Sequence, residues 1–151
     1  MTVDLAKLIE RLKAATGPDR ELDLEIDLYA WPASDIADIA KKHPRGLGSE
    51  GYAWDIWHGA VVVEKRTADG RCPYNAGYPL PAYTSSIDAA MTLVPEGWFV
   101  TICQDQRPGF ANVHKLVNNE GPCNYAEVAT PALALCIAAL KARSATGGGN
   151  G

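Results

Sequence analysis

Long apolar runs are absent from this sequence. No stretch approaches the roughly 18 consecutive apolar residues that a membrane-spanning helix needs. The first segment, residues 1–12, carries charges where a secretory signal peptide would have its apolar region. These two absences predict a protein that neither spans a membrane nor is exported, and we expect it in the cytoplasm.

Clusters of basic residues are also missing. The chain has 14 Lys and Arg residues against 18 Asp and Glu residues, which gives a net charge of −4. Proteins that bind DNA or RNA neutralise phosphates with clustered Lys and Arg, so direct nucleic-acid binding is not expected. The densest charged run, residues 19–27, is instead acidic. It is either a solvated face or an acidic surface that mimics nucleic acid, and the sequence leaves both interpretations open.

Residue patterns that hold metals or carry catalysis are equally scarce. The chain has three His and four Cys, but no Cys-x-x-Cys or His-x-x-x-His pair that would anchor zinc. It contains neither the Gly-x-Ser-x-Gly elbow of hydrolases nor a phosphate-binding P-loop. The sequence therefore identifies no metal ligand, no cofactor and no catalytic residue, and it favours a protein that is not an enzyme.

The cysteines are few and widely spaced. They are Cys72, Cys103, Cys123 and Cys136. Because no signal points to an oxidising compartment, we expect all of them to be free thiols. Cys103 and Cys136 lie in apolar patterns and are expected to be small core residues.

What is present is the composition of one globular domain. Hydrophobic residues make up 47% and charged residues 21% of the chain, which is ordinary for a protein that buries a core. A length of 151 residues is about one domain. We expect a single α/β domain over residues 1–145, of the α+β kind, in which a small, mainly antiparallel sheet packs between helices. Residues 146–151 are expected to be a disordered Gly-rich tail.

Apolar periodicity and turn signals place the elements. Helices are expected over residues 2–15, 34–43, 85–93 and 131–143, and strands within 52–65, 98–103 and 110–117, with a further short one near 125–129. Thr130 should cap the last helix, and Pro131 should begin it, where a missing N–H costs nothing. Ser85 is expected to cap the helix over 85–93, and Arg143 to complement the C-terminal dipole of the last helix.

Residues 20–30 give conflicting signals. Leu22, Leu24, Ile26 and Leu28 alternate with acidic residues, which is the period of a half-buried strand. Asp and Glu are depleted in strands, however, whereas Leu and Glu favour helices. We favour a helix that ends at Trp31-Pro32.

Three stretches in the second half form a recognisable set. They are Pro81–Ala90 (PAYTSSIDAA), Pro95–Trp98 (PEGW) and Ala129–Leu140 (ATPALALCIAAL). The set resembles the phage ABA-sandwich domain, a family of small phage proteins, and residues 15–23 are similar to the opening of related prophage proteins. The resemblance implies an α-β-α sandwich and a bacteriophage or prophage accessory protein acting in a bacterial host cell. It brings no catalytic residues, and residues 31–80 lie outside it.

The region over residues 52–83 is the most informative for binding. Its second part, residues 66–83, reads as an irregular connector stiffened by prolines, and connectors of that length are usually functional or disordered. Tyr and Trp supply rigid recognition surface, and Arg pairs with phosphate or carboxylate groups. The predicted ligand-binding residues are Arg66, Arg71, Tyr74, Asn75 and Tyr78, together with Trp54, Trp57 and His58. The same aromatic residues would also be explained by core packing.

Three functions remain open at this stage. The favoured one is non-catalytic binding of a small anionic, nucleotide-like ligand or of a host protein, with counter-defence as one candidate role. The second is a small hydrolase that uses His58 with a carboxylate such as Asp55. The third is a minor virion or assembly protein. Homo-oligomers are compatible with all three.

Overall fold

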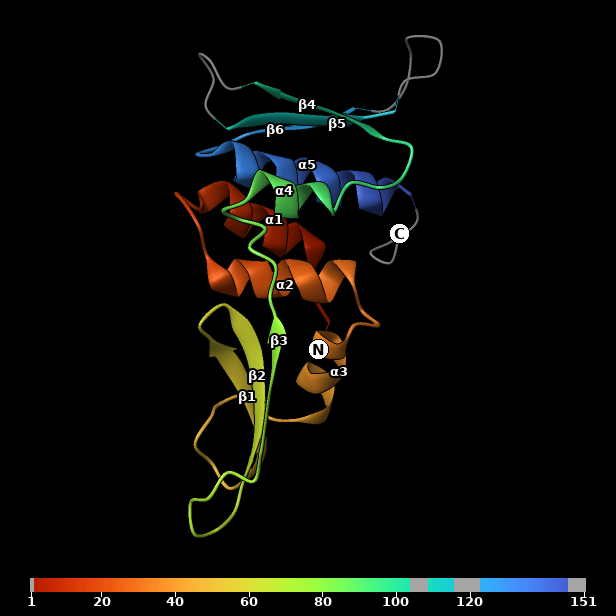
Figure 1. Ribbon diagram of the computed structural model, residues 1–151. Coiled ribbons are helices and arrows are strands. Elements are labelled where there is room, and N and C mark those ends of the chain that lie inside the picture. Colours follow the sequence, from red (N-terminus) through yellow and green to blue (C-terminus); the bar gives the residue numbers. More distant parts are fainter. Residues whose placement is uncertain (1, 104–108, 116–122, 147–151) are drawn as a thin grey trace.

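The computed structural model describes residues 2–103, 109–115 and 123–146 of the chain. Figure 1 shows the arrangement of its helices and strands. In chain order they are α1 (Leu5–Ala14), α2 (Arg20–Ala30), α3 (Asp35–Lys42), β1 (Gly51–Trp57), β2 (Ala60–Arg66), β3 (Tyr74–Pro79), α4 (Ile87–Met91), β4 (Phe99–Cys103), β5 (Phe110–His114), β6 (Cys123–Glu127) and α5 (Pro131–Ala145). The Gly-rich tail lies outside the described residues, apart from Thr146.

The described strands form two separate antiparallel sheets of three strands each. Sheet A has the order β1-β2-β3, and sheet B has the order β4-β5-β6. Helices α5, α4, α1 and α2 lie between the sheets, with sheet B against α5 and sheet A beyond α2 (Figure 1). The predicted α/β class with antiparallel strands is confirmed. The single sheet expected from the sequence is instead divided in two, because the helices separate the first three strands from the last three.

Helix α5 is the centre of the larger apolar core. Every residue from Ala132 to Leu140 is buried, so the helix is apolar on all sides and is covered on all sides. Sheet B, α1 and α4 pack around it. Its start is as predicted: the hydroxyl oxygen of Thr130 accepts the N–H of Leu133 at 3.2 Å, and Pro131 is the first helical residue.

Residues 20–30 are a helix, as favoured from the sequence. The side chain of Asp19 caps it by accepting the N–H groups of Glu21 and Leu22. Its leucines and isoleucine point to two different cores: Leu22 and Ile26 belong to the core around α5, whereas Leu24 and Leu28 belong to the core of sheet A. The alternation that resembled a strand therefore reflects a helix buried on two opposite faces.

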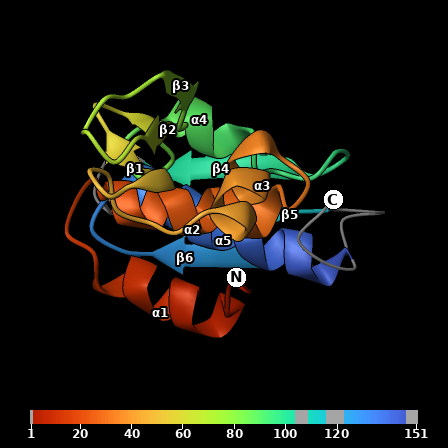
Figure 2. The ribbon, with the colours of Figure 1, turned by 90° about the horizontal axis from the view of Figure 1, so that it is seen from below.

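The second core lies between sheet A, α3 and α2. Figure 2, viewed from the sheet A end, shows α3 beside the three strands, with α2 behind them. The core contains Ile36 and Ile39 from α3, Trp54 from β1, and Val61 and Val63 from β2. Ser34 caps α3 by accepting the N–H of Ala37, which fixes where this helix begins.

The connector that was predicted to be irregular contains a regular strand, β3, so that prediction is wrong for residues 74–79. Residues 74–79 pair with β2, from Lys65 opposite Tyr74 to Ala60 opposite Pro79. The prolines concealed the strand, but β3 is an edge of sheet A, where a proline does not interrupt the ladder. The truly irregular parts are shorter, at residues 67–73 and 80–86.

Two details near helix ends differ from expectation. Helix α4 is capped by Ser86, whose hydroxyl oxygen accepts the N–H of Ala89, and not by Ser85. Arg143 reaches beyond its own helix: it is 3% exposed and donates to the carbonyl oxygens of Ala30 at 2.9 Å and Leu93 at 3.3 Å. It therefore supports the C-terminal end of α2.

No helix in the described part of the chain is long and apolar enough to cross a membrane.

Candidate functional sites

The structure distributes the predicted site residues over sheet A. Trp57 and His58 lie at the β1–β2 turn, whereas Arg66 and Tyr74 lie at the opposite end of the strands. The six residue steps from Gly51 to Trp57 span about 20 Å at the usual rise of a strand. One small ligand therefore does not contact both groups. Trp54 is 1% exposed and belongs to the core, where its indole N–H donates to the carbonyl oxygen of His43.

The far end of sheet A, next to the 67–73 loop, carries a cluster of exposed rings. Tyr52 and Tyr74 are 43% and 44% exposed and lie on either side of Lys65 in the sheet. The rings of Tyr52 and His43 stack with centroids 4.9 Å apart, and Tyr74 meets Tyr52 edge-on at 6.2 Å. The Lys65 ammonium lies 5.4 Å from the Tyr52 ring centroid. We call these four residues the tip cluster.

The predicted arginines already have carboxylate partners. Arg66 donates to the buried Glu64 at 2.8 Å, and Glu64 also accepts the N–H of Gly48. The hydrogen bond from Arg66 is the main reason that the pKa of Glu64 is lowered. Arg71 is exposed and pairs with Asp69 at 2.7 Å. Asn75 is exposed on β3 opposite Glu64.

The β1–β2 turn explains the conformation of His58. His58 and Gly59 are the two residues of a tight hairpin, and both have positive φ, 48° and 76°. Trp57 is 60% exposed and meets the His58 ring edge-on at 4.4 Å. The carboxylate of Asp55 is occupied by Arg45, at 2.9 Å, and by the N–H of Ile56. Among the described residues no hydrogen bond joins His58 to Asp55, so the pair expected of a hydrolase is not formed.

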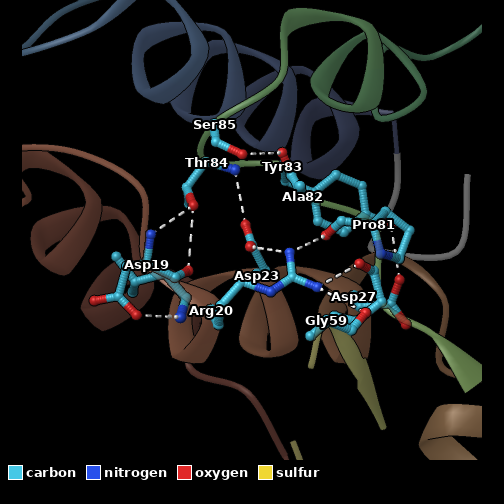
Figure 3. Close-up of polar contacts among 12 residues, drawn as sticks. Asp19, Arg20, Asp23, Asp27, Gly59, Pro81, Ala82, Tyr83, Thr84 and Ser85 are labelled. Atoms are coloured by element: carbon cyan, nitrogen blue, oxygen red, sulfur yellow. Dashed lines mark hydrogen bonds and ion pairs between the residues drawn. The ribbon is translucent and has the colours of Figure 1, made fainter. Parts of the chain in front are cut away.

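A second polar region, which the sequence did not indicate, joins α2 to residues 80–85 (Figure 3). Asp23 is 0% exposed and accepts the N–H of Thr84 and the Arg20 guanidinium, both at 2.7 Å. Arg20 also donates to the carbonyl oxygens of Gly59 and Leu80. These bonds hold the β1–β2 turn and the end of β3 against α2.

One turn further along α2, Asp27 is the final acceptor in a chain of two hydrogen bonds. The indole N–H of Trp31 donates to the Tyr83 hydroxyl oxygen at 3.1 Å, and that hydroxyl donates to Oδ1 of Asp27 at 2.7 Å. Asp27 is only 4% exposed, and burial raises its pKa, while the hydrogen bond from Tyr83 opposes that rise. Burial also raises the pKa of Tyr83, so its hydroxyl stays protonated and remains a donor.

Asp27, Trp31 and Tyr83 line an open surface pocket of about 460 Å³. Strand β3 adds Tyr78, which is one of the predicted ligand-binding residues, and the start of α3 adds Asp35. The other lining residues are Ser34, Ile36, Pro79, Pro81 and Thr92. Next to it, Trp31, Pro32 and Ala33 line a smaller apolar hollow of about 390 Å³. We call the larger one the Asp27 pocket.

The sequence held only part of the signal for this pocket. Asp23 and Asp27 are four residues apart in a helix with buried neighbours on both sides, so they lie on the same face. That the two acids share a face was therefore foreseeable, but not that both are buried. Their partners Tyr83 and Thr84 come 56 and 61 residues later, and no local pattern connects them to α2.

Comparisons with protein-family models, with curated proteins and with solved structures find no match to this chain. Within the described ranges, no three His, Cys, Asp or Glu side chains are grouped so that they could hold a metal ion. The tip cluster and the Asp27 pocket are the candidate sites for binding.

Proposed function

We propose that this chain is a non-catalytic binding protein that contacts a partner protein through the tip cluster. The observation that carries the proposal is a preformed group of exposed rings at the end of sheet A. Figure 1 shows this end of the sheet extending away from α1, α2, α4 and α5. Exposed Tyr side chains on fixed strands supply large contact area at low entropic cost, as in many protein interfaces.

The chemistry of the cluster favours an acidic, partly apolar partner surface. Lys65 and His43 lie beside the two tyrosines, and no carboxylate belongs to the cluster. The net charge of the chain is negative, so this basic spot contrasts with its surroundings. Carboxylates on the partner would pair with Lys65, and apolar groups would pack on Tyr52 and Tyr74.

A partner protein suits this end of the sheet better than a small anionic ligand does. The nearest hollow, of about 450 Å³, is lined by Thr67, Arg71, Cys72 and Pro73, and Arg71 is already paired with Asp69. An anion would have to compete with that carboxylate. The phage context of the proposal rests on the sequence resemblance, which makes a protein of the bacterial host the partner we expect.

The proposal is tested by retention of bacterial proteins on the immobilised chain, with two matched double variants. Tyr52→Ala with Tyr74→Ala removes the tip rings. Phe99→Ala with Tyr125→Ala removes two rings from sheet B that are more exposed than the tip rings, at 58% and 64%. We expect a protein that the wild type and the sheet B variant retain and the tip variant loses. Truncation of a tyrosine that is a hot spot of an interface weakens binding by about tenfold or more.

Equal retention by both double variants would overturn the proposal, as would a wild-type chain that retains no protein. A thermal-shift titration with ADP separates the small-ligand alternative. A shift that Arg71→Ala abolishes, with the tip variant unaffected, would place an anionic ligand beside the 67–73 loop instead.

A further inference from the structure

Asp27 occupies an unfavourable place for a carboxylate. It lies in the last turn of α2, where the helix dipole is negative and favours cations, and that turn has no basic residue. It is 4% exposed, yet no ion pair among the described residues includes it. The Tyr83 hydroxyl donates to Oδ1 of Asp27. The other carboxylate oxygen, Oδ2, has no hydrogen-bond partner in the described part of the chain. A carboxylate that is this little exposed to water and has no counter-ion is costly.

The surroundings of Asp27 add negative charge and aromatic surface. Asp35, from the first turn of α3, lines the same pocket as Tyr78. The pKa of Tyr78 is raised mainly by Tyr74 and by burial, and Asp35 adds a smaller contribution. Trp31 is 37% exposed and forms part of the wall. Cations bind favourably beside such rings, and the protein already places one there: the guanidinium of Arg143 lies 4.7 Å from the Trp31 ring centroid.

The remaining charged groups near Asp27 are engaged elsewhere. Arg20 and Asp23, one turn earlier on α2, pair with each other. Arg143, from α5, donates to the carbonyl oxygens of Ala30 and Leu93. Asp27, Asp35, Tyr78 and Tyr83 are thus the titratable groups that face the pocket.

We propose that the Asp27 pocket binds an organic cation, a primary ammonium or guanidinium group on an apolar stem, with the cation paired to Oδ2 of Asp27. The apolar hollow beside Trp31 and Pro32 accommodates the stem. The raised pKa of Asp27 agrees with a carboxyl that lacks its counter-ion. This pocket and the tip cluster share no residue, and neither proposal depends on the other.

The hydrogen-bond chain supplies a direct readout. A cation at Asp27 changes the charge on the acceptor of the Tyr83 hydroxyl, and that hydroxyl accepts the indole N–H of Trp31. The indole N–H resonance of Trp31, assigned with Trp31→Phe, therefore reports on ligands in this pocket. The resonance of the exposed Trp57 serves as the internal reference.

The experiment compares two probes of nearly the same shape, phenethylammonium and the neutral 2-phenylethanol, by calorimetry and by this resonance. We expect the ammonium to bind at least tenfold more tightly and to shift the Trp31 signal. Its affinity should rise with pH through the pKa of Asp27, because the proton and the cation compete for the same carboxyl. At pH values near or below that pKa, where the free carboxyl holds a proton, binding should release it, and the release appears as a dependence of the heat on the buffer.

Variants complete the test. Asp27→Asn keeps an acceptor for Tyr83 but removes the charge, and it should lose tenfold or more in affinity for phenethylammonium. Asp35→Asn, at the exposed rim, should lose a few-fold and is not expected to disturb folding. Asp38→Asn, on the same helix but away from the pocket, should bind as the wild type does. Equal affinity for the two probes, no binding at millimolar phenethylammonium, or unchanged binding in both pocket variants would each overturn the proposal.

Discussion

Asp23 is the residue on which the contact between α2 and residues 80–85 depends most. It is fully buried and accepts hydrogen bonds from Arg20 and from the N–H of Thr84. Asp23→Ala leaves that N–H without an acceptor and removes the charge partner of Arg20. Because one hydrogen bond to a charged group contributes about 1.5–3 kcal/mol, we expect the free energy of unfolding in urea to fall by about 3 kcal/mol.

Asp38 provides the control for this variant. It pairs with Lys42 at 3.0 Å on α3, and its side chain is 58% exposed. Asp38→Ala should cost only about 0.3–0.5 kcal/mol, as exposed helix pairs do. Equal losses for the two variants would show that the buried network does not stabilise the fold.

Asp27 makes the free energy of unfolding depend on pH in the direction opposite to that expected of a salt-bridged acid. Its folded pKa lies above the unfolded value, so the folded state holds the proton more tightly. Its stabilising contribution is complete below the unfolded pKa of about 4 and is lost as the pH rises through the folded pKa. Relative to Asp27→Asn, the wild type should therefore lose stability from about pH 4 upward. Urea titrations of both proteins between acid and neutral pH measure this, and parallel curves would contradict it.

Most single residues with a local role were predictable from the sequence, although the cap of α4 is Ser86 and not Ser85 as expected, whereas those with a distant partner were not. Thr130, Pro131 and Ser34 act within their own helix ends, so local patterns identify them. Arg143 shows the opposite case: its acceptor on Ala30 is 113 residues away, and the sequence pattern placed its role at the end of its own helix. Tyr83, the partner of Asp27, is 56 residues away in the sequence, and for the same reason it could not be predicted.

At the scale of elements, α5 should be the most sensitive to substitution. Ile137 is 0% exposed in the centre of the larger core. Ile137→Ala removes buried methyl groups and leaves a cavity, so we expect a loss of about 2–5 kcal/mol in the free energy of unfolding. Lys141→Ala, on the half-buried side near the end of α5, should cost about 0.3–1 kcal/mol. Indistinguishable melting temperatures for the two variants would refute the central position of α5.

The element predictions succeeded where one periodicity dominated and failed where two requirements overlapped. Helix α2 was ambiguous because Leu22 and Ile26 face one core while Leu24 and Leu28 face the other. Strand β3 was missed because Pro79 and Gly77 weaken the pattern of a strand, and its pairing with β2 depends on residues outside it. Where the strands separate into two sheets is decided by how the helices pack, which no single segment specifies.

At the scale of the whole molecule, the two cores should unfold together. Helix α2 contributes side chains to both, so neither core is complete without it. Trp54 lies in the core of sheet A, and Trp98 packs against the core of α5. Two variants, in which either Trp54 or Trp98 is the single remaining tryptophan, should show coincident urea transitions by fluorescence. A transition at lower urea for the Trp54 probe would show that sheet A and α3 unfold separately.

The central position of α5 also has a consequence for the order of events during synthesis. Sheet A, α3 and the Leu24–Leu28 side of α2 all lie within residues 20–80, so all the main residues of this core are available as soon as that part has left the ribosome. The core formed by α1, α4 and sheet B assembles later, because α5, which covers their apolar faces, is translated after all of them. A nascent chain paused before residue 131 would present those faces uncovered. Such a chain is the form that we expect chaperones to bind and that is most prone to aggregate.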